Sequence, residues 1–292
     1  MDRNRPGNPP GSTAGKEEST LSGTFLIASG KGGVGKSTLA AGLGAALASL
    51  GSSTVILDAD IGLRGQDALL GLENQVVYDL LDVISGDCEL EQALLPVPRV
   101  SGLWLLPAAQ FARARALDAK SLRRVIRSLR TEHDFVLIDC PAGIERGFRN
   151  VANTGICEPI LVTSPDDISM RDAERACSIL QEKTEGRPRL IVNRLNADLV
   201  HTGEMYSAET VAQTLDCPLL AEIPEDPLVY RALLRHTSFM QLDCPARQAV
   251  IRAARRLRGE DVPFPHLGAA RSSLWQRLRQ LRVREVPSLH DL

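Results

Sequence analysis

The sequence has few aromatic residues, no long apolar run and no apolar N-terminal segment, and each absence excludes a class of protein. Aromatic residues make up 4% of the 292 residues and hydrophobic residues 43%, so the core must be mostly aliphatic. A transmembrane helix needs about 20 consecutive apolar residues, and no run approaches that length. A signal peptide needs a shorter apolar segment, which the polar N-terminus lacks. We therefore expect a globular protein in the cytoplasm.

The cysteines do not form the patterns that bind metals. No two make a C-x-x-C pair, and no Cys/His cluster has the spacing of a zinc site. Scattered cysteines are more often small core residues in a reducing compartment. The six are Cys88, Cys140, Cys157, Cys177, Cys217 and Cys244.

The formal net charge of -2 conceals a basic C-terminal segment. Residues 247–284 contain ten arginines and two acidic residues, a balance of +8 that leaves -10 for the rest of the chain. This asymmetry favours an anionic partner for the segment. A basic helix that only faces solvent is the simpler alternative.

Short apolar segments alternate with helical patterns, which predicts one α/β domain with a mostly parallel twisted sheet and helices on both faces. The clearest helices are expected at 37–50 and 119–130. Strands are expected at 24–29, 54–58, 103–106, 135–139, 159–163, 189–193 and 218–223. The predicted organisation is a disordered polar arm (1–22), the domain (23–260), a linker (261–270), an amphipathic helix (271–284) and a tail (285–292).

A glycine-rich segment follows the first predicted strand and begins the first helix. It reads Gly30-Lys31-Gly32-Gly33-Val34-Gly35-Lys36-Ser37. This fits the P-loop motif G-x-x-x-x-G-K-[ST] in the strand–loop–helix context that the motif requires. Glycines let backbone N–H groups converge on phosphate oxygens, and the helix N-terminus adds partial positive charge. We therefore predict a P-loop NTPase in which residues 30–38, through Thr38, bind the phosphates of ATP.

Polar side chains complete the predicted phosphate site. Lys36 is expected to reach the β- and γ-phosphates, and the Ser37 hydroxyl to bind Mg²⁺. Asp58 and Asp60 lie at and beyond the end of one predicted strand, and Asp139 ends another. Ligands of open α/β sheets bind at the carboxyl ends of strands, where all three aspartates fall. A cap on the following turn is the alternative role for Asp58.

Lys31 is a second lysine near the start of the loop, and the segment resembles the signature of the deviant P-loop ATPases, the MinD/ParA family. The resemblance implies a Mg²⁺-dependent ATPase that forms a homodimer with ATP, in which Lys31 reaches the partner's nucleotide. Lys31 and Lys36 would then stabilise the transferred phosphoryl group. It also implies that Asp60 positions or deprotonates the attacking water and that Asp139, with Ser37 and Asp58, belongs to the metal site.

The same resemblance assigns residues around the γ-phosphate and the base. Gly143 would offer its N–H to the γ-phosphate. Asn193, Arg194 and Pro224 would surround the adenine, with Asn193 hydrogen-bonded to it. The guanine-binding N-K-x-D motif is absent, because Arg194 follows Asn193, and this favours ATP over GTP. A strand-end turn residue is the alternative reading of Asn193.

Longer segments resemble the MinD branch of the family, above all 139–147 but also 58–64, 77–79 and 82–86. This implies a membrane-cycling switch that recruits the division inhibitor MinC and controls placement of the division septum. MinE or another polar determinant would be a further partner. The polar N-terminal arm and the C-terminal tail depart from the pattern.

Residues 271–284 predict a short cationic helix whose apolar side chains fall within an arc of about 120°. This is the composition of an interfacial anchor for an anionic membrane, which would make the protein peripheral at the inner face of the cell membrane. A helix docked on its own domain or on a partner is the alternative. The apolar residues are Leu274, Trp275, Leu278 and Leu281.

Three other members of the wider family are alternatives. A flagellar-number regulator would also dimerise and carry an amphipathic helix, but the segments 77–86 and 139–147 favour the MinD branch. A ParA-type ATPase would bind DNA non-specifically, whereas the arginines here accompany tryptophan and leucine, which suits lipid better; no sequence-specific nucleic acid is expected. An iron–sulfur carrier would need a C-x-x-C pair, which is absent.

Overall fold

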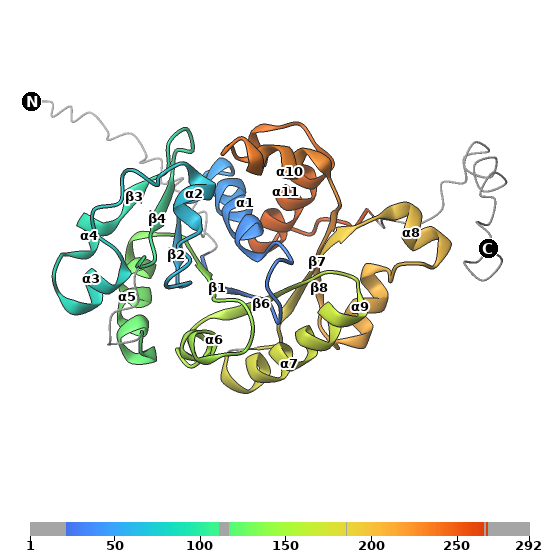
Figure 1. Ribbon diagram of the computed structural model, residues 1–292, viewed down its shortest axis with the longest axis horizontal. Coiled ribbons are helices and arrows are strands. Elements are labelled where there is room, and N and C mark those ends of the chain that lie inside the picture. Colours follow the sequence, from blue (N-terminus) through green and yellow to red (C-terminus); the bar gives the residue numbers. More distant parts are fainter. Residues whose placement is uncertain (1–21, 111–116, 185, 266, 268–292) are drawn as a thin grey trace, which may run out of the picture.

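The computed structural model describes residues 22–110, 117–184, 186–265 and 267. Its centre is an eight-stranded sheet with the order β3-β4-β2-β5-β1-β6-β7-β8 (Figure 1). All neighbouring strands are parallel except β3 and β4. The strands are β1 (Gly23–Ala28), β2 (Thr54–Asp58), β3 (Leu95–Pro96), β4 (Leu103–Leu106), β5 (Phe135–Asp139), β6 (Glu158–Thr163), β7 (Arg189–Leu195) and β8 (Leu219–Pro224). The predicted fold class is confirmed.

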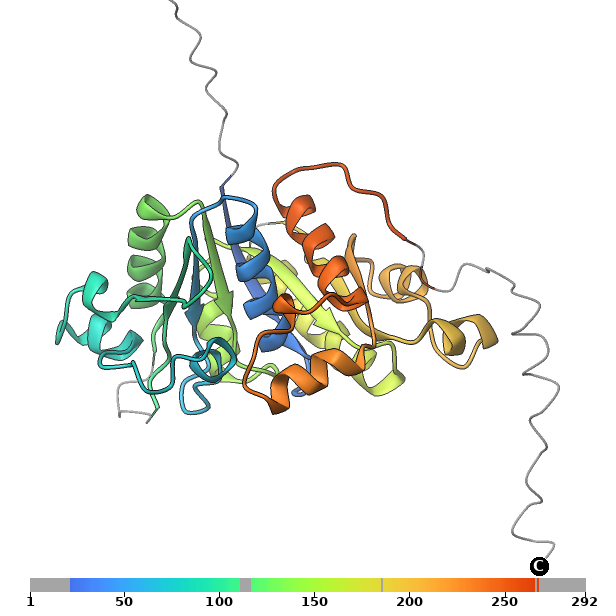
Figure 2. The ribbon, with the colours of Figure 1, turned by 90° about the horizontal axis from the view of Figure 1, so that it is seen from above.

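Helices cover both faces of the sheet. On one face, α1 and α11 contact each other, and Figure 2 shows the blue α1 beside the orange and red α10 and α11. On the other face, α5, α6, α7 and α9 pack on the sheet (Figure 1). The helices are α1 (Lys36–Ser49), α2 (Gln66–Leu70), α3 (Leu80–Ser85), α4 (Leu90–Ala93), α5 (Ala119–Glu132), α6 (Arg146–Ala152), α7 (Asp167–Lys183), α8 (Ala197–Thr202), α9 (Ala208–Thr214), α10 (Pro227–Leu234), the 3₁₀ helix η1 (Phe239–Gln241) and α11 (Pro245–Leu257).

The strands are continuous apolar runs because both of their sides are buried. In β1, Leu26 and Ala28 face the α5/α6/α7 side, while Phe25 and Ile27 face the α1/α11 side. Every residue of β2 and of β5 is buried. The core is therefore two aliphatic layers that meet at the central sheet, as the low aromatic content predicts.

The predicted strands are all present, and their ends differ from the expected ones by at most two residues. The sequence did not reveal β3, which has two residues and pairs antiparallel with β4 at the edge of the sheet. So short a strand carries no apolar alternation that a sequence pattern could detect. The sheet is therefore mostly parallel with one antiparallel edge.

The described part of the predicted linker is fixed to the domain rather than free. From α11, the guanidinium of Arg256 donates to the carbonyl oxygens of Leu220, Val262 and Pro263 at 2.8–2.9 Å. It also lies 3.8 Å above the centre of the Phe264 ring. The packed domain thus extends beyond 260. The predicted arm (1–22, except residue 22), amphipathic helix (271–284) and tail (285–292) lie outside the described residues.

Five of the six cysteines are buried and Cys88 is half-buried, with no disulfide among them. The sulfur atoms of Cys177 and Cys217 lie 3.2 Å apart. Both belong to the apolar core beneath α7, as expected of small core residues. None of the helices in the described ranges is both long enough and apolar enough to cross a membrane.

Candidate functional site

The P-loop connects the end of β1 to the start of α1, at the carboxyl edge of the sheet. Gly33 and Gly35 have φ angles of 82° and 96°, in the left-handed region that favours glycine. These two reversals wrap the loop around the N-terminus of α1. The Ser29 hydroxyl supports the bend by donating to the Lys31 carbonyl at 3.0 Å. The loop therefore has the form that its motif predicts.

Gly30 and Gly35 are also needed because neighbouring atoms approach them closely. A Cβ on Gly30 would lie 2.0 Å from the carbonyl oxygen of Asp172 in α7, and one on Gly35 would lie 2.4 Å from the Asn193 amide nitrogen. Asn193 donates from that nitrogen to the Val34 carbonyl at 2.7 Å. The P-loop is thus held between α7 on one side and the end of β7 on the other.

The structure brings Lys36 and Asp139 together as a buried ion pair. Lys36 Nζ lies 2.6 Å from Asp139 Oδ1 and 3.2 Å from the Ser37 hydroxyl. The two charged side chains are only 5% and 2% exposed. Gln66 donates from Nε2 to the other oxygen of Asp139 at 2.7 Å and to the Ser37 carbonyl at 3.0 Å. The sequence-predicted residues Lys36, Ser37 and Asp139 therefore form one cluster with Gln66, which the sequence did not indicate.

Asp58 sits beside this cluster, where β2 pairs with β5 at Asp139. Its two oxygens accept hydrogen bonds from the backbone N–H groups of Asp60 and Gln66, at 3.0 and 3.1 Å. Burial, and next the charge of Asp139, raise the pKa of Asp58 to about 7. Asp58 thus caps the loop between β2 and α2, which is the alternative role that its position at a strand end indicated. Direct metal binding by Asp58 stays a prediction.

Asp58 gives the metal-free protein a pH-dependent stability. Because its pKa rises from 3.8 to about 7 on folding, the folded state binds more protons across that interval. The contribution of protonated Asp58 to the free energy of unfolding is fully present below pH 3.8 and is lost as the pH rises through about 7. The total loss is on the order of 4 kcal/mol. Without metal or nucleotide, Asp58→Asn should therefore gain stability relative to the parent between pH 5.5 and pH 8. Denaturant unfolding at both values measures this, and an unchanged difference would contradict it.

Asp60 lies within electrostatic reach of the same cluster. Burial raises its pKa, the charge of Lys36 lowers it, and the charge of Asp139 raises it, with a net increase. The carboxylate is half-buried at the start of the loop that leads to α2. Its location beside Lys36 and Asp139 suits the predicted role toward the attacking water.

Lys31 is exposed at the outer side of the loop. Its charge acts on Asp166, just before α7. Burial raises the pKa of Asp166, but hydrogen bonds from Ser164 and Ser169, and then the charge of Lys31, bring that pKa below its ordinary value. Within this protomer, Lys31 takes no part in the Lys36–Asp139 pair. An exposed lysine at this place is free to contact another molecule.

The Gly143 N–H, predicted to contact the γ-phosphate, has a partner within the domain. The φ angle of Gly143 is 85°, and its N–H donates to the Ser29 carbonyl at 3.0 Å. This turn directs the N–H toward the end of β1, so it is not available to a γ-phosphate in this conformation. A role for that N–H in phosphate binding requires the loop after β5 to move.

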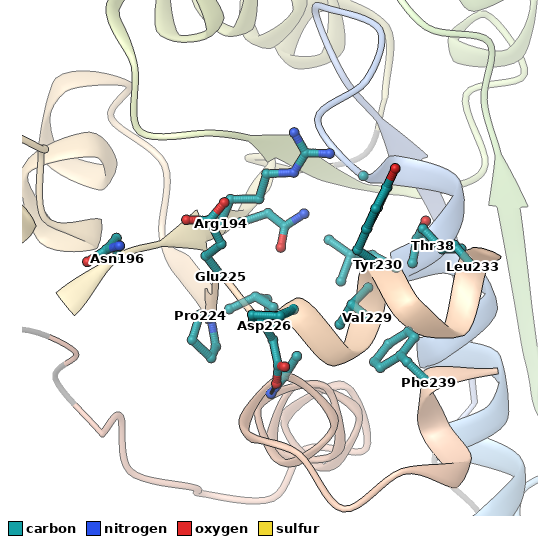
Figure 3. A pocket seen from close by; sticks show the side chains of 16 residues that line it. Thr38, Arg194, Asn196, Pro224, Glu225, Asp226, Val229, Tyr230, Leu233 and Phe239 are labelled. Atoms are coloured by element: carbon teal, nitrogen blue, oxygen red, sulfur yellow. Dashed lines mark hydrogen bonds between the residues drawn. The ribbon is translucent and has the colours of Figure 1, made fainter. Parts of the chain in front are cut away.

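A cavity of about 660 Å³ opens beside the P-loop (Figure 3). Gly35 and Thr38 line it from the loop, and the predicted base-binding residues Asn193, Arg194 and Pro224 line it from the ends of β7 and β8. Arg194 has a φ angle of 61°, and the β7–β8 register shifts between Val192 and Leu195. Because of this irregularity, the adjacent residues Asn193 and Arg194 of β7 both line the cavity.

The sequence missed the apolar wall of this cavity. In Figure 3, Tyr230 and Leu233 of α10 and Phe239 of η1 face it across from Arg194. The only signal was a helix that follows Pro224, Glu225 and Asp226 at the end of a strand. A flat aromatic base would pack against these side chains, and polar groups from Asn193 would contact its edge.

The residues at the ends of β2 and β5 suit a hydrated Mg²⁺ ion. Mg²⁺ is usually held by one or two carboxylates together with substrate phosphates, so it needs no cluster of three protein ligands; the described residues contain no such cluster of His, Cys, Asp or Glu. Asp58 and Asp139 are paired at the ends of β2 and β5, and the Ser37 hydroxyl contacts the same Lys36 Nζ that pairs with Asp139. A hydrated Mg²⁺ bound here would supply the positive charge that Asp139 loses when Lys36 contacts the phosphates.

The predicted membrane residues Leu274, Trp275, Leu278 and Leu281 lie outside the described residues. The exposed large apolar side chains of the described part are elsewhere. They include Leu63 and Val77 at 77% and 79% exposure, and Ile168, Tyr230 and Leu234 at about two thirds.

Comparison with known proteins agrees with this geometry. Residues 20–257 match the ParA family model, described as NUBPL iron-transfer P-loop NTPase. The septum site-determining protein MinD of Synechocystis sp. is 41% identical over 259 residues, which cover 88% of this chain and 97% of that protein. The C-x-x-C pair expected of an iron–sulfur carrier is absent from the sequence.

Solved structures give the same result. The MinC:MinD cell division protein complex of Aquifex aeolicus matches with a TM-score of 0.77 and 38% identity, over 84% of this chain and 100% of that one. MinD of Pyrococcus horikoshii complexed with Mg-ADP matches with a TM-score of 0.70 and 30% identity, over 80% and 95%. The chain is a nucleotide-binding ATPase, and it belongs to the MinD branch of the ParA family of P-loop NTPases, the septum site-determining proteins.

Proposed function

We propose that this protein is an ATP-hydrolysing switch that places the division septum: it dimerises with ATP, binds the membrane in that state and recruits a MinC-type inhibitor. The observation that carries this proposal is the similarity to MinD across almost the whole length of the relatives, 97% for the Synechocystis protein. It is accompanied by a P-loop with both lysines and by a buried Lys36–Asp139 pair beside that loop.

The residues of the site act mainly by position and charge. Lys36 leaves Asp139 Oδ1 to contact the β- and γ-phosphates of ATP, and the backbone N–H groups of residues 30–38 surround those phosphates. Ser37 and Asp139 would hold the metal, and Asp60 would orient the attacking water. Bound Mg²⁺ supplies the charge that neutralises the phosphate oxygens.

Lys31 makes this site responsive to dimerisation. Lys31 is exposed and takes no part in the Lys36–Asp139 cluster of its own protomer. Its charge therefore acts on a nucleotide only when Lys31 reaches the nucleotide of a second copy. Hydrolysis is then slow in the monomer and faster in the dimer. The nucleotide lies next to the cavity walled by Asn193, Arg194 and Pro224, which takes the adenine.

The C-terminal segment 271–284 converts dimerisation into membrane binding. One short amphipathic helix buries little apolar area, so a monomer binds lipid weakly. A dimer carries two, and simultaneous binding raises the overall affinity by roughly 100-fold or more. The protein is then cytoplasmic as a monomer and peripheral at the inner face of the membrane as an ATP dimer.

Co-sedimentation with anionic liposomes tests this proposal. The full chain should sediment with ATP or a non-hydrolysable analogue but not with ADP, and truncation before Arg271 or the Leu278→Glu substitution should abolish sedimentation. Gln280→Glu, the same charge change on the polar side of the predicted helix, is the matched control and should retain it. Lys31→Ala should bind ATP but fail to dimerise and therefore fail to sediment.

Two outcomes would contradict the membrane switch. If the protein forms a dimer with ATP but does not sediment with liposomes in the presence of any nucleotide, the membrane anchor is excluded. Binding to DNA that falls steeply with salt would favour a partition ATPase instead. For the partner, purified MinC from the same cell should join the liposome pellet only with ATP and this protein present; because the Aquifex MinD structure is a complex with MinC, a failure to do so would remove that partner from the proposal.

A further inference from the structure

Gln66 is a polar residue that is fully buried in the interior of the domain. It is the first residue of α2 and is 0% exposed. Its backbone N–H is held by Asp58, and its side chain extends to the start of α1 and the end of β5. One amide therefore connects three segments of the site: the loop after β2, the P-loop helix and the metal-binding carboxylate.

The orientation of this amide follows from its neighbours. The group at 2.7 Å is a carboxylate oxygen of Asp139, and the group at 3.0 Å is the Ser37 carbonyl oxygen. Both are acceptors, so only the NH₂ end of the amide can face them. Both hydrogens of Nε2 are thereby used, and Oε1 points away from these two partners.

Oε1 is buried and has no hydrogen-bond partner among the described residues. A buried carbonyl oxygen without a donor is unfavourable and is uncommon in folded proteins. Only a group that brings hydrogens, such as a water molecule, would satisfy it. The water shell of a small divalent cation has this property.

The two oxygens of Asp139 have different partners. Lys36, on Oδ1, is the residue that is proposed to move to the phosphates of ATP, whereas Gln66, on Oδ2, carries no charge that would draw it to them. When Lys36 leaves, the hydrogen bond from Gln66 still fixes the plane of the carboxylate.

We propose that Gln66 is a positioning residue of the metal site, which fixes the Asp139 carboxylate through Nε2 and would leave Oε1 as an acceptor for a water molecule. Because the same residue begins α2 and is tied to Asp58, metal occupancy is thereby coupled to the order of the loop after β2. This inference rests on the proposed Mg²⁺–nucleotide site. A purely structural role, in which Gln66 only fills the interior and satisfies Ser37, is the competing explanation.

The test is the Mg²⁺ dependence of ADP binding, followed by the fluorescence of a labelled ADP, which needs no hydrolysis. Gln66→Met keeps the volume of the side chain and removes both the donor and the acceptor. We expect the Mg²⁺ concentration for half-maximal ADP binding to rise about 10-fold or more, the effect typical of lost support to a metal ligand. ADP binding in EDTA is measured alongside, so that a change in the Mg²⁺ requirement is separated from a change in nucleotide affinity. Gln213→Met, an exposed change on α9, is the control.

Each outcome decides between the two roles. A folded Gln66→Met protein with an unchanged Mg²⁺ requirement overturns the inference, and a lower melting temperature in EDTA without a Mg²⁺ shift assigns a structural role. If Gln66→Met does not fold, Gln66→Asn replaces it as the test variant. Asn keeps the amide but is one methylene too short to reach both acceptors, so the same rise in the Mg²⁺ concentration for half-maximal ADP binding is expected. A parent protein whose ADP binding ignores Mg²⁺ would overturn the proposed metal site itself.

Discussion

Gly30→Ala is expected to destabilise the protein and to abolish ATP binding. The added Cβ would lie 2.0 and 2.2 Å from the carbonyl oxygen and carbon of Asp172 and 2.7 Å from the nitrogen of Ala173. These are backbone atoms in the interior of α7, which cannot rotate away as a side chain could. Either the P-loop or α7 must move, at a cost of about 3 kcal/mol. For a domain of this size that lowers the melting temperature by roughly 6–12 °C.

Gly32→Ala is the matched control for this prediction. Its Cβ would meet nothing nearer than the Ala142 Cβ at 4.0 Å. The two variants add the same methyl group to the same loop, two residues apart, so a general preference for glycine would affect them equally. Thermal melting of both in the absence of nucleotide separates the explanations. Equal melting temperatures for the two variants would show that contact with α7 does not explain the glycine.

Lys36→Met is expected to abolish hydrolysis and to destabilise the nucleotide-free protein. Loss of a charged group that acts on the transferred phosphate typically reduces the rate by at least about 100-fold. The second effect arises because Asp139 is left buried beside Asp58 without its cation, and removing one partner of a buried pair costs about 3–5 kcal/mol. Gln66 still donates to Asp139, so we expect the lower end of that range. ATPase assays and melting in EDTA measure the two effects.

A double variant separates catalysis from stability. In Lys36→Met with Asp139→Asn, the buried site has lost both members of the ion pair, and its melting temperature should return close to that of the parent. Hydrolysis should remain absent, because neither the phosphate-binding cation nor the metal-binding carboxylate is present. If Lys36→Met alone melts like the parent, the pair does not stabilise the nucleotide-free state in the way its burial indicates.

The sequence by itself determined the frame of the fold and the phosphate-binding loop. Buried parallel strands read as apolar runs whose ends are marked by turn residues, so β2, β4 and β5 could be located to the residue. The P-loop is contiguous, and its conformation follows from glycines within eight positions. Both are local features, in which the residues that determine the structure are neighbours in the chain.

Only the tertiary structure decided which partners each polar group has. Gln66 and Asp139 are 73 residues apart and Asn193 and Val34 are 159 apart, and neither pairing leaves a periodic pattern. The same applies to the Gly143 N–H, which is bound to Ser29, and to Arg256, which fixes the chain beyond 260. Hydrogen bonds are directional and short-ranged, so a residue's partners depend on packing of distant segments to within a few tenths of an ångström, which local propensity does not encode.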